Sequence, residues 1–413
     1  RRFRLCKPFV LDPSDLDSAR LRMSPSQRVA SIDAFRGFVM LLMMAEVIRL
    51  GRVAEAFPDS GFWEFLAYHQ SHVSWVGCSL HDLIQPSFSF LVGVALPFSI
   101  ASRVARGQSH GVMLGHALWR ALLLVLLGVF LRSVHADQTN WTFEDTLSQI
   151  GLGYPFLFLL GFQSVRKQLI ALGVILVGYW LAWAMHPLPG EGFDYGAIGA
   201  SADWQHHAQG FAAHWNKHLN LGSTFDRWFL NLFPRSEAYV VNGGGYLTLS
   251  FIPTLGTMIL GLLAGNWIKA DLAPMARIKR FLIAGVLGLV LGQLLHSLGL
   301  CPIVKRIWTP SWVLFSGGWC FLLLAGFYAI LDWRQCQKWA FPLIVIGMNS
   351  IAAYCIAHLI HHFTVTNFKT HFGQNIFEMA GAGYAPLVEG IAVLAVFWLI
   401  LFWMFRRKLF LRI

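Results

Sequence analysis

The stretch that decides the fold class is residues 82–101, which read DLIQPSFSFLVGVALPFSIA. Its only charged residue is Asp82, at the first position. A helix of about 20 such residues is long enough to cross the ~30 Å hydrocarbon core of a bilayer. Pro86 and Pro97 are tolerated there because neighbouring helices can satisfy the freed backbone groups. The stretch therefore predicts a transmembrane helix.

Nine other segments share this apolar pattern, and the whole composition agrees with them. The chain has 413 residues, of which 56% are hydrophobic and 13% are charged, whereas a soluble domain carries about 25% charged residues. We predict an all-α polytopic membrane protein of about ten transmembrane helices. The predicted spans are 36–50, 82–101, 112–133, 147–163, 168–186, 247–268, 280–299, 312–332, 340–362 and 386–405.

The distribution of basic residues predicts the orientation. Lys and Arg are concentrated in alternate connections and in the C-terminal tail, in the segments SRVARG, SVRKQ, KADLAPMARIKR, DWRQCQKW and RRKLFLRI. Because cytoplasmic loops are enriched in Lys and Arg, both termini are predicted to be cytoplasmic and residues 187–246 to form a long periplasmic loop. Lys305 and Arg306 are a local exception on the outer side. The net charge of +11 then indicates topology and attraction to anionic lipid rather than to nucleic acid.

Residues 1–27 are basic and polar and contain no apolar signal-peptide region, so we expect a disordered cytoplasmic tail followed by one membrane domain at 28–413. The six cysteines are scattered without metal-ligand spacing, so no metal site is expected. Cys78 and Cys301 lie on the predicted outer side, which allows a disulfide between them.

Residues 69–93, HQSHVSWVGCSLHDLIQPSFSFLVG, hold the densest set of reactive groups. His72 and Asp82 flank the mouth of the second span. A histidine is a natural general base, and a nearby carboxylate can orient it. The same residues could instead only cap the outer end of the helix. The long outer connections 51–81 and 187–246 are of a length that is usually functional, and their aromatic and His residues suit sugar binding or interfacial anchoring.

Several polar groups are expected at membrane depth, where they face a bundle interior or a wet cavity. They are Glu46, His116, Arg120, Gln149, His296, Asn349 and His358. Arg120 could reach an anionic ligand. Arg36, within SIDAFRG at 31–37, could pair with Asp33, contact a phosphate, or simply mark the cytoplasmic boundary.

A series of motifs, taken in order, resembles one family. The motifs are SIDAFRG (31–37), HVSWVG (72–77), HDLIQPSFSFLVG (81–93), LSQIGLGY (147–154), FDR (225–227), TLGTMILGLLAG (254–265), WTPSWVLFSGG (308–318), GMNSIAAY (347–354) and RRKLF (406–410). Together they are similar to the transmembrane acyltransferases of the heparan-α-glucosaminide N-acetyltransferase family and its bacterial relatives, over nearly the whole chain from about residue 28.

This resemblance implies a membrane enzyme that passes an acetyl group from cytosolic acetyl-CoA to an amino sugar or glycan at the periplasmic face. It implies that His72, within the HVSW segment, is the catalytic base, and that Asp82, with Leu83 and Pro86, matches the family's D-L-x-x-P element and is a second catalytic residue. Cofactor contacts would come from Arg36, Arg120, Gln149 and Asn349. Acceptor contacts would come from the outer face, with Trp75, Asp226 and Arg227 as candidates.

The sequence departs from the family at the outer end of the first span, where an active-site Asn is replaced by the run Ala45-Glu46-Val47-Ile48. Either Glu46 takes over that role or the role lies elsewhere. A homodimer is a reasonable expectation from the family. The missing luminal domain favours a multi-pass protein of the bacterial inner membrane.

Two other classes of function remain open. A secondary transporter for an organic anion or glycan would also use intramembrane Arg and His, although no repeat symmetry is visible. A non-enzymatic partner in envelope assembly would bind mainly through the 187–246 loop.

Overall fold

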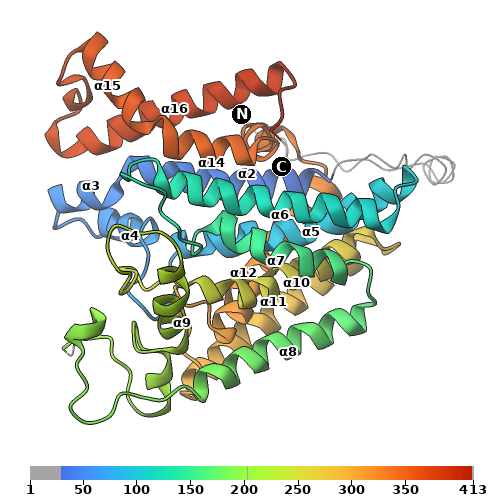
Figure 1. Ribbon diagram of the computed structural model, residues 1–413. Coiled ribbons are helices and arrows are strands. Elements are labelled where there is room, and N and C mark those ends of the chain that lie inside the picture. Colours follow the sequence, from blue (N-terminus) through green and yellow to red (C-terminus); the bar gives the residue numbers. More distant parts are fainter. Residues whose placement is uncertain (1–28, 202, 412–413) are drawn as a thin grey trace, which may run out of the picture.

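The computed structural model describes residues 29–201 and 203–411, so the predicted tail at 1–27 lies outside the described residues. It is a bundle of helices that run lengthwise beside one another (Figure 1). The long helices are α5 (Ile84–Ala105), α6 (His110–Ser133), α8 (Val165–Ala184), α10 (Phe251–Lys269), α11 (Pro274–Ser297), α12 (Pro310–Tyr328) and α16 (Ala385–Arg406). The shorter ones are α2 (Ala30–Met44), α3 (Leu50–Ala56), α4 (Gly61–His69), α7 (Thr146–Leu160), α9 (Leu221–Phe229), α13 (Phe341–Gly347), α14 (Ser350–Leu359) and α15 (His361–Phe372).

The helical class and the membrane character of the chain are confirmed. Within the described residues, 7 helices are long and apolar enough to cross a bilayer, and 8 are if α13 and α14 count as one bent span. All seven coincide with predicted spans, and the bent pair coincides with 340–362. The chain is a multi-pass helical membrane protein.

Two of the ten predicted spans are occupied by helices that are too short to cross a bilayer fully. The predicted spans 36–50 and 147–163 correspond to α2 and α7, which have 15 residues each. Fifteen residues rise only about 22 Å, less than the ~30 Å hydrocarbon core. After α2 the chain tightens into the 3₁₀ turn η1 (Ala45–Ile48), and Arg49 then adopts a left-handed conformation with φ 51°. A span count of ten stays a prediction.

Close contacts between backbones fix α5 against α10. A Cβ at Gly93 would collide with the carbonyl oxygen of Met258, and one at Gly261 would collide with that of Phe90. Small residues let membrane helices approach this closely, so dispersion contacts and packing replace the hydrophobic effect that lipid does not supply. This contact sets the position of α5, whose two ends carry the groups described below.

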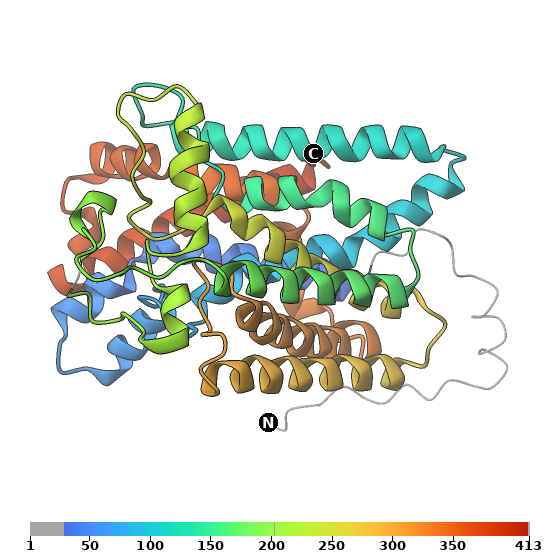
Figure 2. The same ribbon diagram turned by 60° about the horizontal axis from the view of Figure 1, so that its bottom comes forward.

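The two ends of the bundle differ in construction. Short connections at 106–109, 161–164 and 270–273 join the helices at one end, which we call the Arg36 end. At the other, the His72 end, α3, α4, α9 and the long 187–246 connection gather together (left in Figures 1 and 2). Cys78 and Cys301, which could have formed a disulfide, are both free thiols.

The α5–α10 contact generates a stability prediction. Gly261→Ala adds a methyl group against the Phe90 carbonyl and should destabilise the protein by about 1–3 kcal/mol, the usual effect of overpacking. This would be measured as a lower melting temperature in detergent. Gly173→Ala in α8 is the matched control, because nothing lies within 4 Å of its new Cβ, and it should melt at or slightly above the wild-type temperature. Equal melting of Gly261→Ala and wild type would contradict the packing argument.

Candidate functional site

His72 and Asp82 form a hydrogen-bonded pair at the His72 end. His72 lies in the irregular segment after α4, and Asp82 lies in the 3₁₀ turn η2 (His81–Leu83) that leads into α5. The His72 Nδ1 atom is 2.8 Å from Asp82 Oδ1. The Asp82 side chain is 1% exposed and the His72 side chain is 34% exposed. Because an ionised carboxylate only accepts hydrogen bonds, Nδ1 donates to Asp82, and in the neutral imidazole Nε2 keeps a lone pair.

The second oxygen of Asp82 organises the loop that carries His72. Asp82 Oδ2 accepts hydrogen bonds from the backbone N–H groups of Val73 (3.3 Å) and Ser79 (3.0 Å). The Asp82 N–H in turn donates to Ser79 Oγ at 3.2 Å. This reciprocal pair is of the capping-box type, which a Ser three residues before an acidic residue signals at the start of a helix. The Asp82 carboxylate therefore both caps the start of the helix and is hydrogen-bonded to His72, so the two interpretations of this segment do not exclude each other.

A lysine from a distant part of the chain completes the pair. Lys305 Nζ lies 3.6 Å from Asp82 Oδ1 and 3.1 Å from His72 Nδ1. Its segment is joined to the His72 loop by a β-bridge between Val76 and Val304. Sequence reasoning did not identify Lys305 as a site residue. The only sign of it in the sequence was a basic residue on the predicted outer side, where Lys and Arg are otherwise rare.

Glu46 also reaches this cluster. His81 Nε2 lies 3.2 Å from Glu46 Oε1, and the His81 ring is 4.5 Å from the His72 ring. The Glu46 side chain is 56% exposed, so its carboxylate is open to solvent beside two imidazoles. Tyr246 lies on another side of His72, with 6.4 Å between the centroids of the two rings.

The three predicted acceptor contacts have structural partners. Trp75 is buried, and its Nε1 donates to the Trp215 carbonyl at 3.1 Å. Asp226 accepts from the Thr248 N–H at 3.0 Å, and burial raises its pKa to about 7. Arg227 donates to the His218 carbonyl and to Thr224 Oγ1. These contacts hold together the folded 187–246 region.

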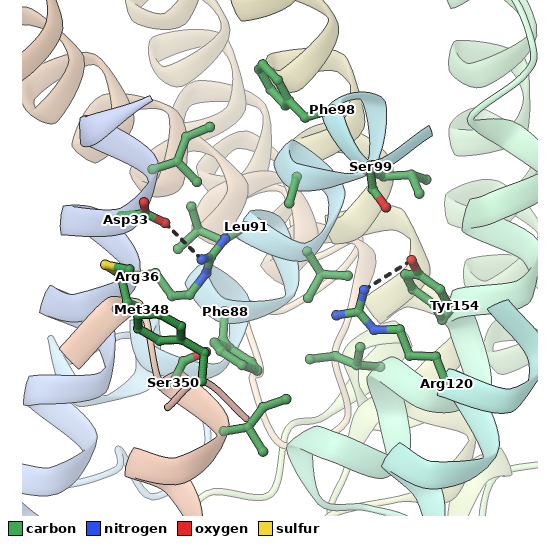
Figure 3. A pocket seen from close by; sticks show the side chains of 18 of the residues that line it. Asp33, Arg36, Phe88, Leu91, Phe98, Ser99, Arg120, Tyr154, Met348 and Ser350 are labelled. Carbon is green, nitrogen blue, oxygen red and sulfur yellow. Dashed lines mark hydrogen bonds and ion pairs between the residues drawn. The ribbon is translucent and has the colours of Figure 1, made fainter. Parts of the chain in front are cut away.

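A cavity of about 670 Å³ opens toward the Arg36 end. This volume suits a small-molecule ligand. Its lining includes four arginines, Arg36, Arg103, Arg106 and Arg120, and one acidic residue, Asp33. Figure 3 shows Arg36 with Asp33 on one wall and Arg120 with Tyr154 on the other, at hydrogen-bond distances of 3.2 Å each. The excess of guanidinium groups favours an anionic ligand.

The apolar part of this cavity lies along α5, the helix that begins just after Asp82. Phe88 and Leu91 of α5 line it together with Leu147 and Ile150 of α7. Phe88 follows Asp82 by six residues, which corresponds to about 9 Å of helical rise. Because α5 begins just after Asp82 and ends beside Arg103 and Arg106, one helix connects the imidazole to the arginines.

Of the four predicted cofactor ligands, Arg36 and Arg120 line the cavity, whereas Gln149 and Asn349 brace its walls. Gln149 Nε2 donates to the Leu247 carbonyl at 2.9 Å, and its Oε1 accepts from Thr254 at 3.0 Å. Asn349 sits where α13 and α14 bend by 68° and holds the C-terminal segment through the Leu409 carbonyl and the Leu411 N–H. Arg103 and Arg106 were recognised in the sequence only as a topology signal.

Comparison with known proteins gives a distant relationship over the whole chain. No family model matches the sequence. The chain is 25% identical over 449 residues to human heparan-alpha-glucosaminide N-acetyltransferase and 25% identical over 448 residues to the mouse protein, matches that cover 99% of this chain. The chain spans 64% of the length of these relatives. The relationship supports the family resemblance carried by the motifs.

The Asp82 contacts generate a second stability prediction. Asp82→Ala removes an acceptor from the 73–79 backbone and leaves Lys305 buried without its carboxylate. Breaking a buried charge pair costs about 3–5 kcal/mol, so we expect a clearly lower melting temperature in detergent. Asp59→Ala, at an exposed turn position, is the control and should melt like the wild type. An unchanged melting temperature for Asp82→Ala would show that the carboxylate does not organise the loop.

Proposed function

We propose that this protein is a membrane acetyltransferase that moves an acetyl group from acetyl-CoA to an amino sugar or glycan. The observation that carries the proposal is the arrangement along α5, which has the 2.8 Å His72–Asp82 pair before its first turn and a four-arginine cavity beside its other end. The two relatives, both N-acetyltransferases by name, support the same reaction class.

The arginine-lined cavity is the proposed donor site. Arg36, Arg103, Arg106 and Arg120 would bind the phosphates of CoA, because guanidinium groups pair with phosphate in two-pronged hydrogen bonds. The pantetheine arm would extend along the apolar wall formed by Phe88 and Leu91 toward His72. Gln149 and Asn349 would act indirectly, by holding the walls in place.

His72 is the proposed general base. Its Nε2 would take a proton from the acceptor amine, whose nitrogen would attack the thioester carbonyl. Collapse of the tetrahedral intermediate would break the carbon–sulfur bond and form the amide. The imidazolium would then return the proton to the CoA thiolate. Asp82 would keep His72 in the tautomer with Nε2 unprotonated, and burial lowers the His72 pKa, which favours the neutral imidazole.

Glu46 is the proposed acceptor-binding carboxylate. It is exposed beside His81, and a carboxylate in that position would attract an amino sugar in its ammonium form or bind a sugar hydroxyl. Direct contact of the acceptor with Trp75, Asp226 or Arg227 stays a prediction. Through the partners described above, these residues would shape the covering 187–246 loop.

The orientation of the enzyme follows from the basic residues. The Arg36 end would face the cytoplasm, where acetyl-CoA is available, and the His72 end would face the periplasm. We propose a multi-pass protein of a bacterial inner membrane, in which a homodimer is one possible assembly.

One observation favours the alternative of a transporter. The 68° break between α13 and α14 lies beside the cavity, and discontinuous helices often form transporter binding sites. A transporter would bind its anion without consuming a thioester, so the activity experiment below separates the two functions.

The general-base role predicts a large kinetic effect. His72→Ala should reduce turnover by about 10²–10⁴-fold, the typical contribution of general acid–base catalysis. Release of CoA thiol from acetyl-CoA would be measured with glucosamine and mixed glycan acceptors. His135→Ala, at an exposed position of the α6–α7 connection, is the control and should turn over normally. Near-wild-type turnover of His72→Ala would refute the base assignment.

The donor site predicts ligand-dependent stability. Saturating acetyl-CoA should raise the melting temperature, since a ligand at 100 times its Kd stabilises the folded state by about 2.7 kcal/mol. Arg36→Gln and Arg120→Gln should each weaken binding by about 10–100-fold, because each removes a charge-assisted hydrogen bond. Arg52→Gln, exposed in α3 at the opposite end, should bind normally. A wild-type protein whose melting temperature responds to neither CoA nor acetyl-CoA would contradict the donor-site assignment.

A further inference from the structure

Lys305 is a buried lysine whose position is fixed by its own segment. It lies in the connection between α11 and α12, and its side chain is 5% exposed. Besides the Val76–Val304 bridge, the Gly77 N–H donates to the Ile303 carbonyl at 3.0 Å. Thr309 Oγ1 accepts from the Val304 N–H at 3.1 Å. A buried ammonium group is costly unless it is paired, so this rigid placement next to Asp82 needs an explanation.

The distances show how the ammonium group meets the imidazole. Lys305 Nζ is 3.1 Å from His72 Nδ1 and 3.3 Å from Nε2. The in-plane bonding directions of these two nitrogens point away from each other. An atom almost equally close to both therefore lies along neither direction, and a linear hydrogen bond to Nε2 is excluded. The ammonium sits against the ring and acts through its charge, while the Nε2 lone pair stays available to a substrate.

We propose that Lys305 is a positioning residue for His72, a fixed positive charge that keeps the imidazole neutral and ready to accept the acceptor's proton. This inference rests on the proposed acetyl transfer. In a simple His–Asp pair, protonation of the imidazole cancels the carboxylate charge and is favoured. With Lys305 the Asp82 charge is already balanced, so protonation of His72 adds a positive charge next to a neutral Asp82–Lys305 pair and is opposed.

The other charged or titratable groups around His72 are Asp82, His81 with its partner Glu46, Tyr246, and Arg306. Arg306 donates to the Gly244 and Val73 carbonyls at 2.8 Å and 3.3 Å. Burial lowers the pKa of His72, and the positive charge of Lys305 lowers it further against the opposing effect of Asp82. The charge of His81 also lowers the pKa of His72, by less than that of Lys305. The Glu46 carboxylate acts in the opposite sense, but it is 56% exposed and paired with His81. Burial also lowers the pKa of Lys305 to about 8, so it is still largely charged at pH 7.

The arrangement serves both halves of the proposed reaction. A neutral imidazole is ready to take the amine proton. Once protonated beside Lys305, it is a stronger acid than an ordinary imidazolium, because the like charge disfavours it. The proton therefore moves readily to the departing CoA thiolate, which regenerates neutral His72. Lys305 forms and breaks no covalent bond in this sequence.

The test measures the protonation of His72 directly. The rate at which diethyl pyrocarbonate modifies His72, followed across pH by peptide mass spectrometry in the full-length protein, reports the neutral imidazole whether or not acetyl transfer occurs. In Lys305→Met the midpoint should rise by about 1–3 pH units, the usual effect of a nearby charge. The midpoint of the acidic limb of the kcat/KM profile should move to higher pH by the same amount. Lys305→Arg keeps the charge and should retain a near-wild-type midpoint.

The control is Lys217→Met, which removes another lysine at the His72 end. The Lys217 ammonium lies 5.5 Å from the centre of the Trp204 ring. This variant should change neither the His72 modification midpoint nor the pH profile of kcat/KM. A His72 midpoint unchanged in Lys305→Met, in a protein that still melts cooperatively, would overturn the proposal even if His72 is essential. If Lys305→Met does not fold, the proposal would be overturned by a His72 midpoint in Lys305→Arg that differs from the wild-type midpoint by about 1 pH unit or more. A shifted midpoint in a protein without acetyltransferase activity would support the electrostatic role and reject the proposed function.

Discussion

The buried carboxylate of Asp82 is the group on which the organisation of the His72 end depends. It accepts hydrogen bonds from His72 and from two backbone N–H groups, and it lies within 3.6 Å of Lys305. A carboxylate that is 1% exposed is stable only when such partners surround it. The same requirement brings together the loop after α4, the start of α5 and the α11–α12 connection. Stability and the chemistry of the site therefore share one electrostatic centre.

The bundle keeps the two parts of the candidate site apart and connects them through α5. The glycine contacts of α5 with α10 hold this helix close against the α10 backbone. The imidazole lies at one end and the arginine-lined cavity reaches the other, with Phe88 and Leu91 between them. This separation suits a substrate with a polyanionic part and a long apolar arm. A compact anion would fill only the arginine end.

Sequence reasoning singled out some residues of the candidate site and could not single out the others. His72, Asp82, Arg36 and Arg120 stood out because charged or imidazole groups next to apolar runs are unusual. Gln149 and Asn349 stood out for the same reason, yet the structure uses them to brace helices, because an amide side chain satisfies a backbone group and a ligand equally well. Lys305 lies 233 residues from His72, and no local periodicity records a contact over that separation.

The amino-acid sequence by itself determined that the chain is a helical membrane protein, the approximate positions of its helices and the presence of a His–Asp element. Hydrophobic runs of bilayer length allow no other class of structure, because backbone groups in lipid must bond within their own helix. Only the tertiary structure decided which charges meet. It placed the first helix at Ala30–Met44, six residues before the predicted span 36–50, bent the chain at Asn349, and placed Lys305 against His72. Those outcomes depend on how helices pack across long sequence separations, where side-chain shape and buried charge pairs select among arrangements that local sequence leaves open.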